Sequence, residues 1–149
     1  MRLDFERHAA GFSRAMAHLD HAATKELDRV GFDPKLRELV RLRNAQLVGC
    51  AYCLDMHSKD ARAIGETEQR LYGLAAFGDA PFYSEREKAA LAFTDAMTRG
   101  QVTDGAYAAA AEHFSEDEMG ALVSLIATIN AWTHLSVTTL AWEPGSYEA

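Results

Sequence analysis

Both cysteines of the chain fall in one short stretch, Cys50-Ala51-Tyr52-Cys53, and His57 follows four residues after the second of them. Glu38 lies twelve residues before Cys50, so the whole pattern reads Glu-x11-Cys-x-x-Cys-x3-His. Two thiols at this spacing can form and break a disulfide, an imidazole can carry protons, and a carboxylate can orient the imidazole. These residue types in this order predict thiol redox chemistry.

The residues around the cysteines predict two helices joined at Gly49. The first spans 34–48 and opens with an aspartate N-cap followed by a proline at the first helical position. The second spans 50–64 and is ended by a glycine. Cys50 then lies at or near a helix N-terminus, where free N–H groups and the helix dipole favour a thiolate. We therefore expect at least one cysteine to be unusually reactive.

The spacing on these helices suits a relay of protons. Cys50 and Cys53 lie about 5–6 Å apart between Cα atoms on a helix, within the window of roughly 4.4–6.8 Å that a disulfide needs. His57 lies one turn beyond Cys53 on the same face. If the two helices are antiparallel, Glu38 and His57 lie roughly 16 Å and 12 Å from the turn, so they are nearly level. We expect Glu38 to orient His57, and His57 to exchange a proton with Cys53.

Other uses of the cysteine pair are weaker interpretations. A structural zinc site needs four ligands, and the sequence offers one Cys pair, with His57 as a third ligand and no clear fourth. A structural disulfide would close a very short loop, for which the entropic gain is small. Two inert buried cysteines are a further alternative. We expect no metal and no other cofactor.

The pattern and its flanks resemble the core of the AhpD-like alkylhydroperoxidases, within the carboxymuconolactone decarboxylase superfamily. The resemblance covers roughly residues 33–135, with its core motif at about 33–77. It implies an all-α fold whose subunits form homo-oligomers, and the helical patterns of the chain predict a bundle of about six to seven helices. It also implies that the cysteine pair cycles between dithiol and disulfide while reducing peroxides. The matching segments are 38–43, 49–53, 55–62, 65–72 and 130–132.

By this resemblance the catalytic residues are Cys50, Cys53, His57 and Glu38, in a thiol-dependent peroxidase or disulfide oxidoreductase. Its partners would be a hydroperoxide substrate and an external dithiol or disulfide reductant. Some members carry a histidine between the cysteines, where this chain has Tyr52, so a relay through that second imidazole cannot operate. Tyr52 could line the pocket, donate a hydrogen bond or only pack.

Two questions stay open at this point. The nearness of His57 favours Cys53 as the attacking sulfur, whereas the helix terminus favours Cys50. The decarboxylase branch of the superfamily is not built on a Cys-x-x-Cys, which favours redox work. The alternatives are a decarboxylase-like lyase, for which the cysteines are incidental, and a non-enzymatic oligomer that senses redox state.

Composition bounds the remaining classes of function. We expect one domain over residues 1–149, and a net charge of −7 makes a nucleic-acid partner a poor fit. We expect a solvated helix face formed by Arg37, Arg41 and Arg43. The first eight residues contain no apolar core of a signal peptide, so we expect a cytoplasmic protein. In that compartment a Cys-x-x-Cys is more often catalytic or metal-binding than structural.

The rest of the chain also has helical patterns and no convincing strand. Between Glu118 and Glu143 lie 24 residues without a charged side chain, long enough to raise the question of a membrane span. Serine, threonine, asparagine and histidine interrupt this stretch, so we expect no membrane contact but a buried helix that continues into a subunit contact over Gly120–Trp142. Further helices are expected at about 8–29, 67–77, 85–98, 104–114 and from 116 to the stop at Pro144, with capping boxes at Ser84–Glu87 and Ser115–Glu118.

Overall fold

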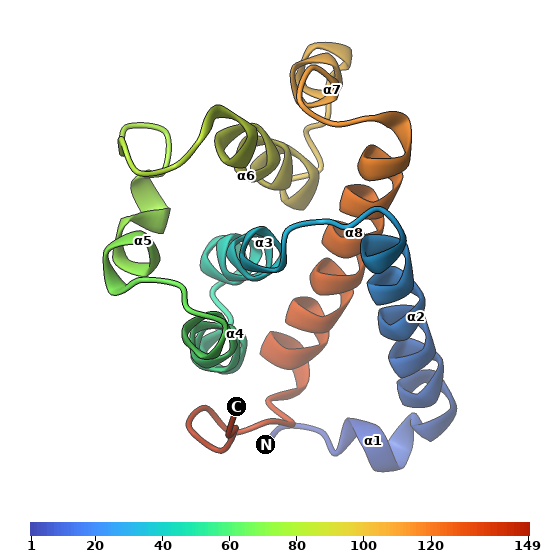
Figure 1. Cartoon of the computed structure of the whole chain (residues 1–149). Helices are drawn as coiled ribbons and strands as arrows, with labels where there is room; N and C mark the ends of the chain where they lie inside the picture. Colours follow the sequence, from blue (N-terminus) through green and yellow to red (C-terminus); the bar gives the residue numbers. More distant parts are fainter.

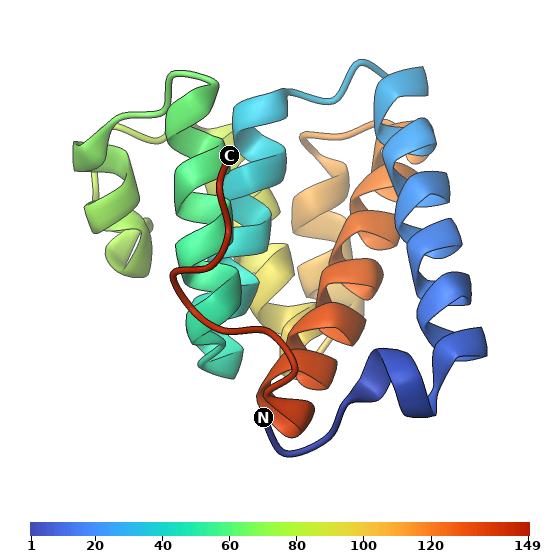
Figure 2. The same ribbon diagram turned by 90° about the horizontal axis from the view of Figure 1, so that it is seen from below.

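The computed structural model describes residues 1–149 and is entirely helical, as predicted (Figures 1 and 2). It has eight α-helices and one 3-10 turn, against the six to seven helices expected. The elements are α1 (Phe5–His8), α2 (Ala10–Arg29), α3 (Pro34–Val48), α4 (Ala51–Ala63), α5 (Glu68–Gly73), the 3-10 turn (Leu74–Ala76), α6 (Glu85–Thr98), α7 (Asp104–Ala111) and α8 (Glu116–Thr139).

Helix α8 runs through the middle of the bundle and packs against α2, α3, α4, α6 and α7 (Figure 1). By length and composition it is the one helix that could cross a bilayer. One face of it packs into the core, where Leu122 and Ile126 are fully buried together with Leu39 of α3 and Leu91 of α6. This is the buried helix that the uncharged stretch predicted.

The hairpin of α3 and α4 forms as the local signals predict. The Asp33 carboxylate accepts a hydrogen bond from the Leu36 amide at 2.9 Å and caps α3. Gly49 ends α3 with a φ of 79°, a left-handed conformation that is costly for any residue with a Cβ. Cys50 follows at once as the N-cap of α4, so the thiol pair begins at the turn itself.

A buried amide joins three helices near the centre of the bundle. Asn44 of α3 is fully buried. Its Nδ2 donates to Thr98 Oγ1 of α6 at 3.0 Å and to Asn130 Oδ1 of α8 at 2.5 Å, and its Oδ1 accepts from Thr133 Oγ1 at 2.9 Å. These hydrogen bonds fix the position of α3 along its axis relative to α6 and α8.

Three helix boundaries differ from those predicted. The first expected helix is interrupted at Ala9, whose ψ of 42° turns the chain between α1 and α2. Helix α7 begins at Asp104 after the Thr103 cap, whose hydroxyl accepts from the Ala106 amide, and it ends at Ala111, before the expected end at 114. Helix α8 stops at Thr139, short of Pro144, because Leu140 adopts a left-handed φ of 50° and reverses the chain.

The two ends of the chain meet at this reversal. The amides of Arg2 and Leu3 donate to the Thr139 carbonyl at 2.8 and 3.1 Å. Residues 140–149, called the C-terminal segment below, have no regular structure and run back across the bundle beside α4 (Figure 2).

Candidate active site

The α3–α4 hairpin brings the predicted site residues together. Cys50 and Cys53 are joined as a disulfide with their Cα atoms 5.3 Å apart, within the range expected from their spacing on one helix. The Cys53 amide lies 3.2 Å from the Cys50 sulfur, which therefore caps the first turn of α4. Both residues are buried, at 1% and 5% exposure.

Glu38 and His57 face each other across the hairpin, as predicted from their similar distances from the turn at Gly49. His57 Nδ1 lies 3.0 Å from Glu38 Oε2, and the other carboxylate oxygen accepts from the Arg41 guanidinium. Burial raises the pKa of Glu38, but the hydrogen bond from His57 and the charge of Arg41 outweigh it, and the net pKa is lowered. An ionised carboxylate only accepts hydrogen bonds, so Nδ1 carries the hydrogen and Nε2 is left as the basic nitrogen.

The interpretation of the arginines on α3 as a solvated face is wrong for all three, and the side chain of Arg37 is only 14% exposed. The Arg41 side chain is only 17% exposed because it is paired with Glu38. Arg43 is buried against α6, where Asp95 accepts two hydrogen bonds from its guanidinium at 2.6 and 2.7 Å. Only contacts formed in the folded chain reveal this, since the partner of Arg43 is far away in sequence.

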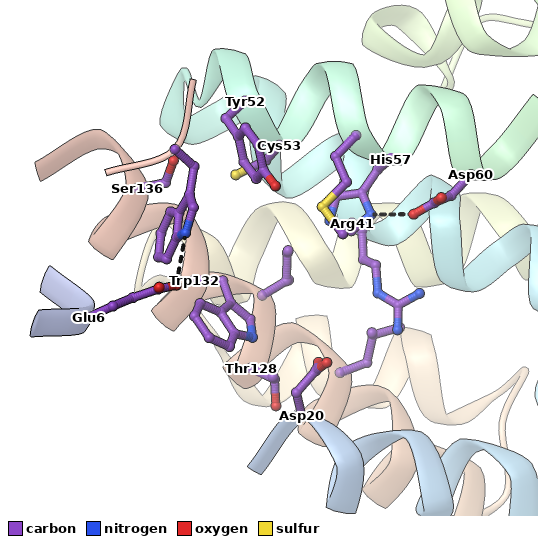
Figure 3. Close-up of a pocket in the computed structure, with 14 residues that line it drawn as sticks. Glu6, Asp20, Arg41, Tyr52, Cys53, His57, Asp60, Thr128, Trp132 and Ser136 are labelled. Atoms are coloured by element: carbon purple, nitrogen blue, oxygen red, sulfur yellow. Dashed lines mark hydrogen bonds and ion pairs between the residues drawn. The ribbon is translucent and has the colours of Figure 1, made fainter. Parts of the chain in front are cut away.

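Asp60 is a site residue that the sequence pattern did not single out. Its Oδ2 lies 3.9 Å from His57 Nδ1, on the side away from the cysteines (Figure 3). Its other oxygen accepts a 2.7 Å hydrogen bond from the hydroxyl of Tyr147 in the C-terminal segment. The spacing of three residues from His57 on one helix was a usable signal, whereas the contact with Tyr147 was not visible in the sequence.

A cavity of about 390 Å³ opens beside the disulfide (Figure 3). Cys53 and His57 line it, whereas Cys50 and Glu38 do not. Tyr52 also lines it, so this side chain is part of the pocket wall. Burial is the main cause that raises the pKa of Tyr52, and nearby acidic charges raise it further. The remaining lining residues are apolar (Met56, Leu125, Ile129, Trp132 and Trp142) or polar (Glu6, Asp20, Arg41, Asp60, Thr128 and Ser136).

One cluster in this region could offer metal ligands. Glu38, His57 and Asp60 each present a ligand atom within 4.8 Å of the others. Both oxygens of Glu38 are engaged, one by the Arg41 cation and one by the imidazole N–H. A divalent ion would have to displace Arg41 from Glu38, so this donor set fits an ion pair better than a metal.

Fold and site together define a helical protein built around a buried Cys-x-x-Cys disulfide. Residues 10–96 match the carboxymuconolactone decarboxylase family, and the chain belongs to that family. It is 44% identical over 104 residues to the uncharacterized protein YdfG of Bacillus subtilis, across 68% of this chain and 71% of YdfG. The uncharacterized protein YnjA of Escherichia coli is 30% identical over 107 residues, across 70% of this chain and 59% of YnjA.

Solved structures confirm the AhpD-like fold. The protein ATU0492 of Agrobacterium tumefaciens, of unknown function and provisionally assigned to antioxidant defence as AhpD, superimposes with a TM-score of 0.86 at 28% identity. That match covers 96% of this chain and 97% of ATU0492. The debrominase Bmp8 matches with a TM-score of 0.77 at 18% identity, over 93% of this chain and 74% of Bmp8, a likeness that concerns the fold alone.

Proposed function

We propose that the protein is a thiol-dependent peroxidase that reduces hydroperoxides with the Cys50–Cys53 pair and is reset by an external dithiol. The observation that carries this proposal is the shared wall of the cavity. Cys53 faces the same 390 Å³ space as His57, and His57 is held by an ionised Glu38. A thiol, a base and room for a small substrate therefore lie together.

The same observation favours Cys53 over Cys50 as the attacking sulfur. Cys53 is the cysteine in contact with the cavity, whereas Cys50 does not line it and is only 1% exposed. In the reduced enzyme, His57 Nε2 takes the proton of Cys53. The first turn of α4, with its free amides, stabilises the thiolate. The helix terminus still favours Cys50, whose sulfur lies 3.2 Å from the Cys53 amide, so the proposal for Cys53 rests on its contact with the cavity and with His57.

The reaction then has three balanced steps. The Cys53 thiolate attacks the peroxide and breaks the O–O bond, giving a sulfenic acid and an alkoxide that takes a proton from His57. The Cys50 sulfur attacks the sulfenic acid, forms the disulfide and releases water. An external dithiol then transfers two electrons to the disulfide by thiol–disulfide exchange and leaves as its own disulfide. We expect this donor in the cytoplasm, where dithiol reductants are available.

Trapping of the oxidised sulfur tests the proposal. Reduced protein is treated with one equivalent of hydroperoxide and analysed by mass spectrometry, with a cyclic 1,3-diketone present to capture sulfenic acid. Wild type should lose two hydrogens within one chain. Cys50→Ser should carry one diketone adduct on Cys53, and Cys53→Ser should not react with peroxide at a rate above that of a free thiol.

Turnover separates the rival functions. With excess dithiothreitol, a peroxidase consumes many equivalents of hydroperoxide per chain. A redox sensor loses two thiols but does not turn over, and a decarboxylase-like lyase keeps its activity in Cys53→Ser. Stoichiometric oxidation without turnover would leave the sensor as the better description.

A further inference from the structure

We propose that the C-terminal segment is the lid of the thiol site and that Trp142 controls which molecules reach the Cys53 sulfur. The inference deepens the proposed function, because a lid matters only if the pair is reduced from outside. It concerns residues 140–149, which the Glu-x11-Cys-x-x-Cys-x3-His pattern does not include.

The burial of the disulfide limits how an external thiol can reach it. Reduction proceeds by contact between an incoming thiolate and one sulfur, yet Cys50 and Cys53 are only 1% and 5% exposed. The cavity is the route that reaches Cys53, and its walls come mostly from helices. Trp142 is the lining residue that belongs to no helix.

Trp142 closes this wall by aromatic contacts. Its ring centroid lies 6.1 Å from that of Tyr52, next to Cys53 in sequence, and 5.8 Å from that of Trp132 on α8. Its indole N–H donates to Glu6 of α1 at 3.3 Å. One side chain thus joins α4, α8 and α1 over the pocket, and its removal would widen the pocket on the side nearest Tyr52.

Three hydrogen bonds to α4, called the latch below, hold the segment down. The Gly145 amide donates to Asp55 Oδ2 at 3.0 Å, Lys59 Nζ donates to the Tyr147 carbonyl at 2.8 Å, and the Tyr147 hydroxyl donates to Asp60 at 2.7 Å. The hydrogen bond with Asp60 and partial burial raise the pKa of Tyr147 to about 12, so the hydroxyl keeps its proton.

The latch is weak enough to open. Residues 143–146 are exposed, and the segment has no backbone hydrogen bonds of a helix to lose. One of the three latch hydrogen bonds is exposed and two are partly buried, and segments with few buried contacts open locally at small free-energy cost. The lid would therefore open and close many times in the folded protein, and a dithiol would attack Cys53 in the open form.

The rate of disulfide reduction tests the lid without any peroxide. Oxidised protein is mixed with dithiothreitol, the reaction is stopped with iodoacetamide, and the doubly alkylated chain is counted by mass spectrometry. Tyr147→Phe should accelerate reduction roughly three- to ten-fold, the change in open population when one ordinary hydrogen bond is lost. Trp142→Ala and a chain ending at Leu140 should be faster still.

Matched variants separate the lid from general loosening. Tyr72→Phe removes a tyrosine hydroxyl that pairs with the Glu68 carboxylate on α5, away from the cavity, and should leave the rate unchanged. Ser146→Ala lies in the segment but outside the latch, and should also match wild type.

Equal rates in wild type, Tyr147→Phe and Trp142→Ala, all folded by circular dichroism, would overturn the lid. Those two full-length variants decide the matter even if the shortened chain does not fold. If the protein does not turn over peroxide but the latch variants are reduced faster, the result counts against the proposed function and still supports the lid.

Discussion

Glu38 is held from two sides, by a cation on its own helix and by an imidazole on the next. This arrangement makes the carboxylate a fixed acceptor, because the pairing with Arg41 and His57 keeps it ionised despite its burial. Its role in the proposed reaction is to hold His57 in the tautomer that leaves Nε2 free.

Loss of either relay residue should slow peroxide reduction without unfolding the chain. His57→Ala removes the base and should lower kcat/KM by about 10²–10⁴, the usual range for general acid–base catalysis. Glu38→Gln should give a smaller loss, because the amide can still accept a hydrogen bond from the imidazole. His134→Ala, on an exposed turn of α8, is the control for histidine removal. Wild-type rates in both relay variants would remove these residues from the mechanism.

The lowered pKa of Glu38 also predicts how stability depends on pH. A carboxyl whose pKa is lower in the folded state stabilises the fold above its ordinary pKa of 4.5, and this contribution is lost as pH falls through the folded value. At pH 7 Glu38→Gln should lower the free energy of unfolding by about 1–3 kcal/mol, since Arg41 loses its partner.

The difference between wild type and Glu38→Gln should then shrink below pH 4.5. Urea denaturation at a series of pH values measures both curves, and Glu112→Gln at the exposed end of α7 serves as the control. Parallel curves from pH 7 to pH 3 would show that the ionisation of Glu38 does not contribute to stability.

At the scale of elements, the turn at Gly49 sets where the thiol pair begins. The φ of 79° is costly for alanine, although an added Cβ would meet no atom within 4 Å. Gly49→Ala should therefore lower the free energy of unfolding by about 1–2 kcal/mol through backbone conformation alone. Gly11→Ala, in α2 and equally unobstructed, should raise it by about 0.4–1 kcal/mol. A stabilising effect of Gly49→Ala in chemical denaturation would contradict the observed turn.

The elements that the sequence predicts well are those whose signals are local. Caps, the glycine turn and three- and four-residue spacings were enough to place Cys50, Cys53, His57 and Glu38 on one hairpin. The course of the chain after Thr139 was not predictable, because Leu140 has none of the usual marks of a left-handed residue and Pro144 gave a later stop. The contact of Tyr147 with Asp60 depends on that reversal and was missed with it.

At the scale of the whole molecule, self-association through the Gly120–Trp142 region stays a prediction. Helix α8 leaves Val123 and Ala127 along a shallow groove that they share with Leu19 of α2, and Leu19 and Phe12 are about half exposed. A second copy could cover these apolar side chains.

Light scattering at micromolar concentration should give a mass of at least two chains. Ala127→Glu would place a charge in the groove and should shift the mass toward one chain, whereas Ala109→Glu on the exposed face of α7 should not. A single-chain mass for wild type would show that α8 is only an intramolecular core helix.

The buried amide of Asn44 can form all of its hydrogen bonds in only one alignment of the three helices. A slip of α3 by one turn, about 5.4 Å, would still set apolar side chains against apolar neighbours. The slip would also separate the amide from its hydrogen-bond partners on α6 and α8. Each buried group left unpaired would cost roughly 1–3 kcal/mol of stability. Helix α8, which carries the cavity residue Leu125, is therefore held in register with α3 when that side chain is exchanged for a smaller one. That makes this bundle a suitable scaffold for redesigning what the pocket accepts.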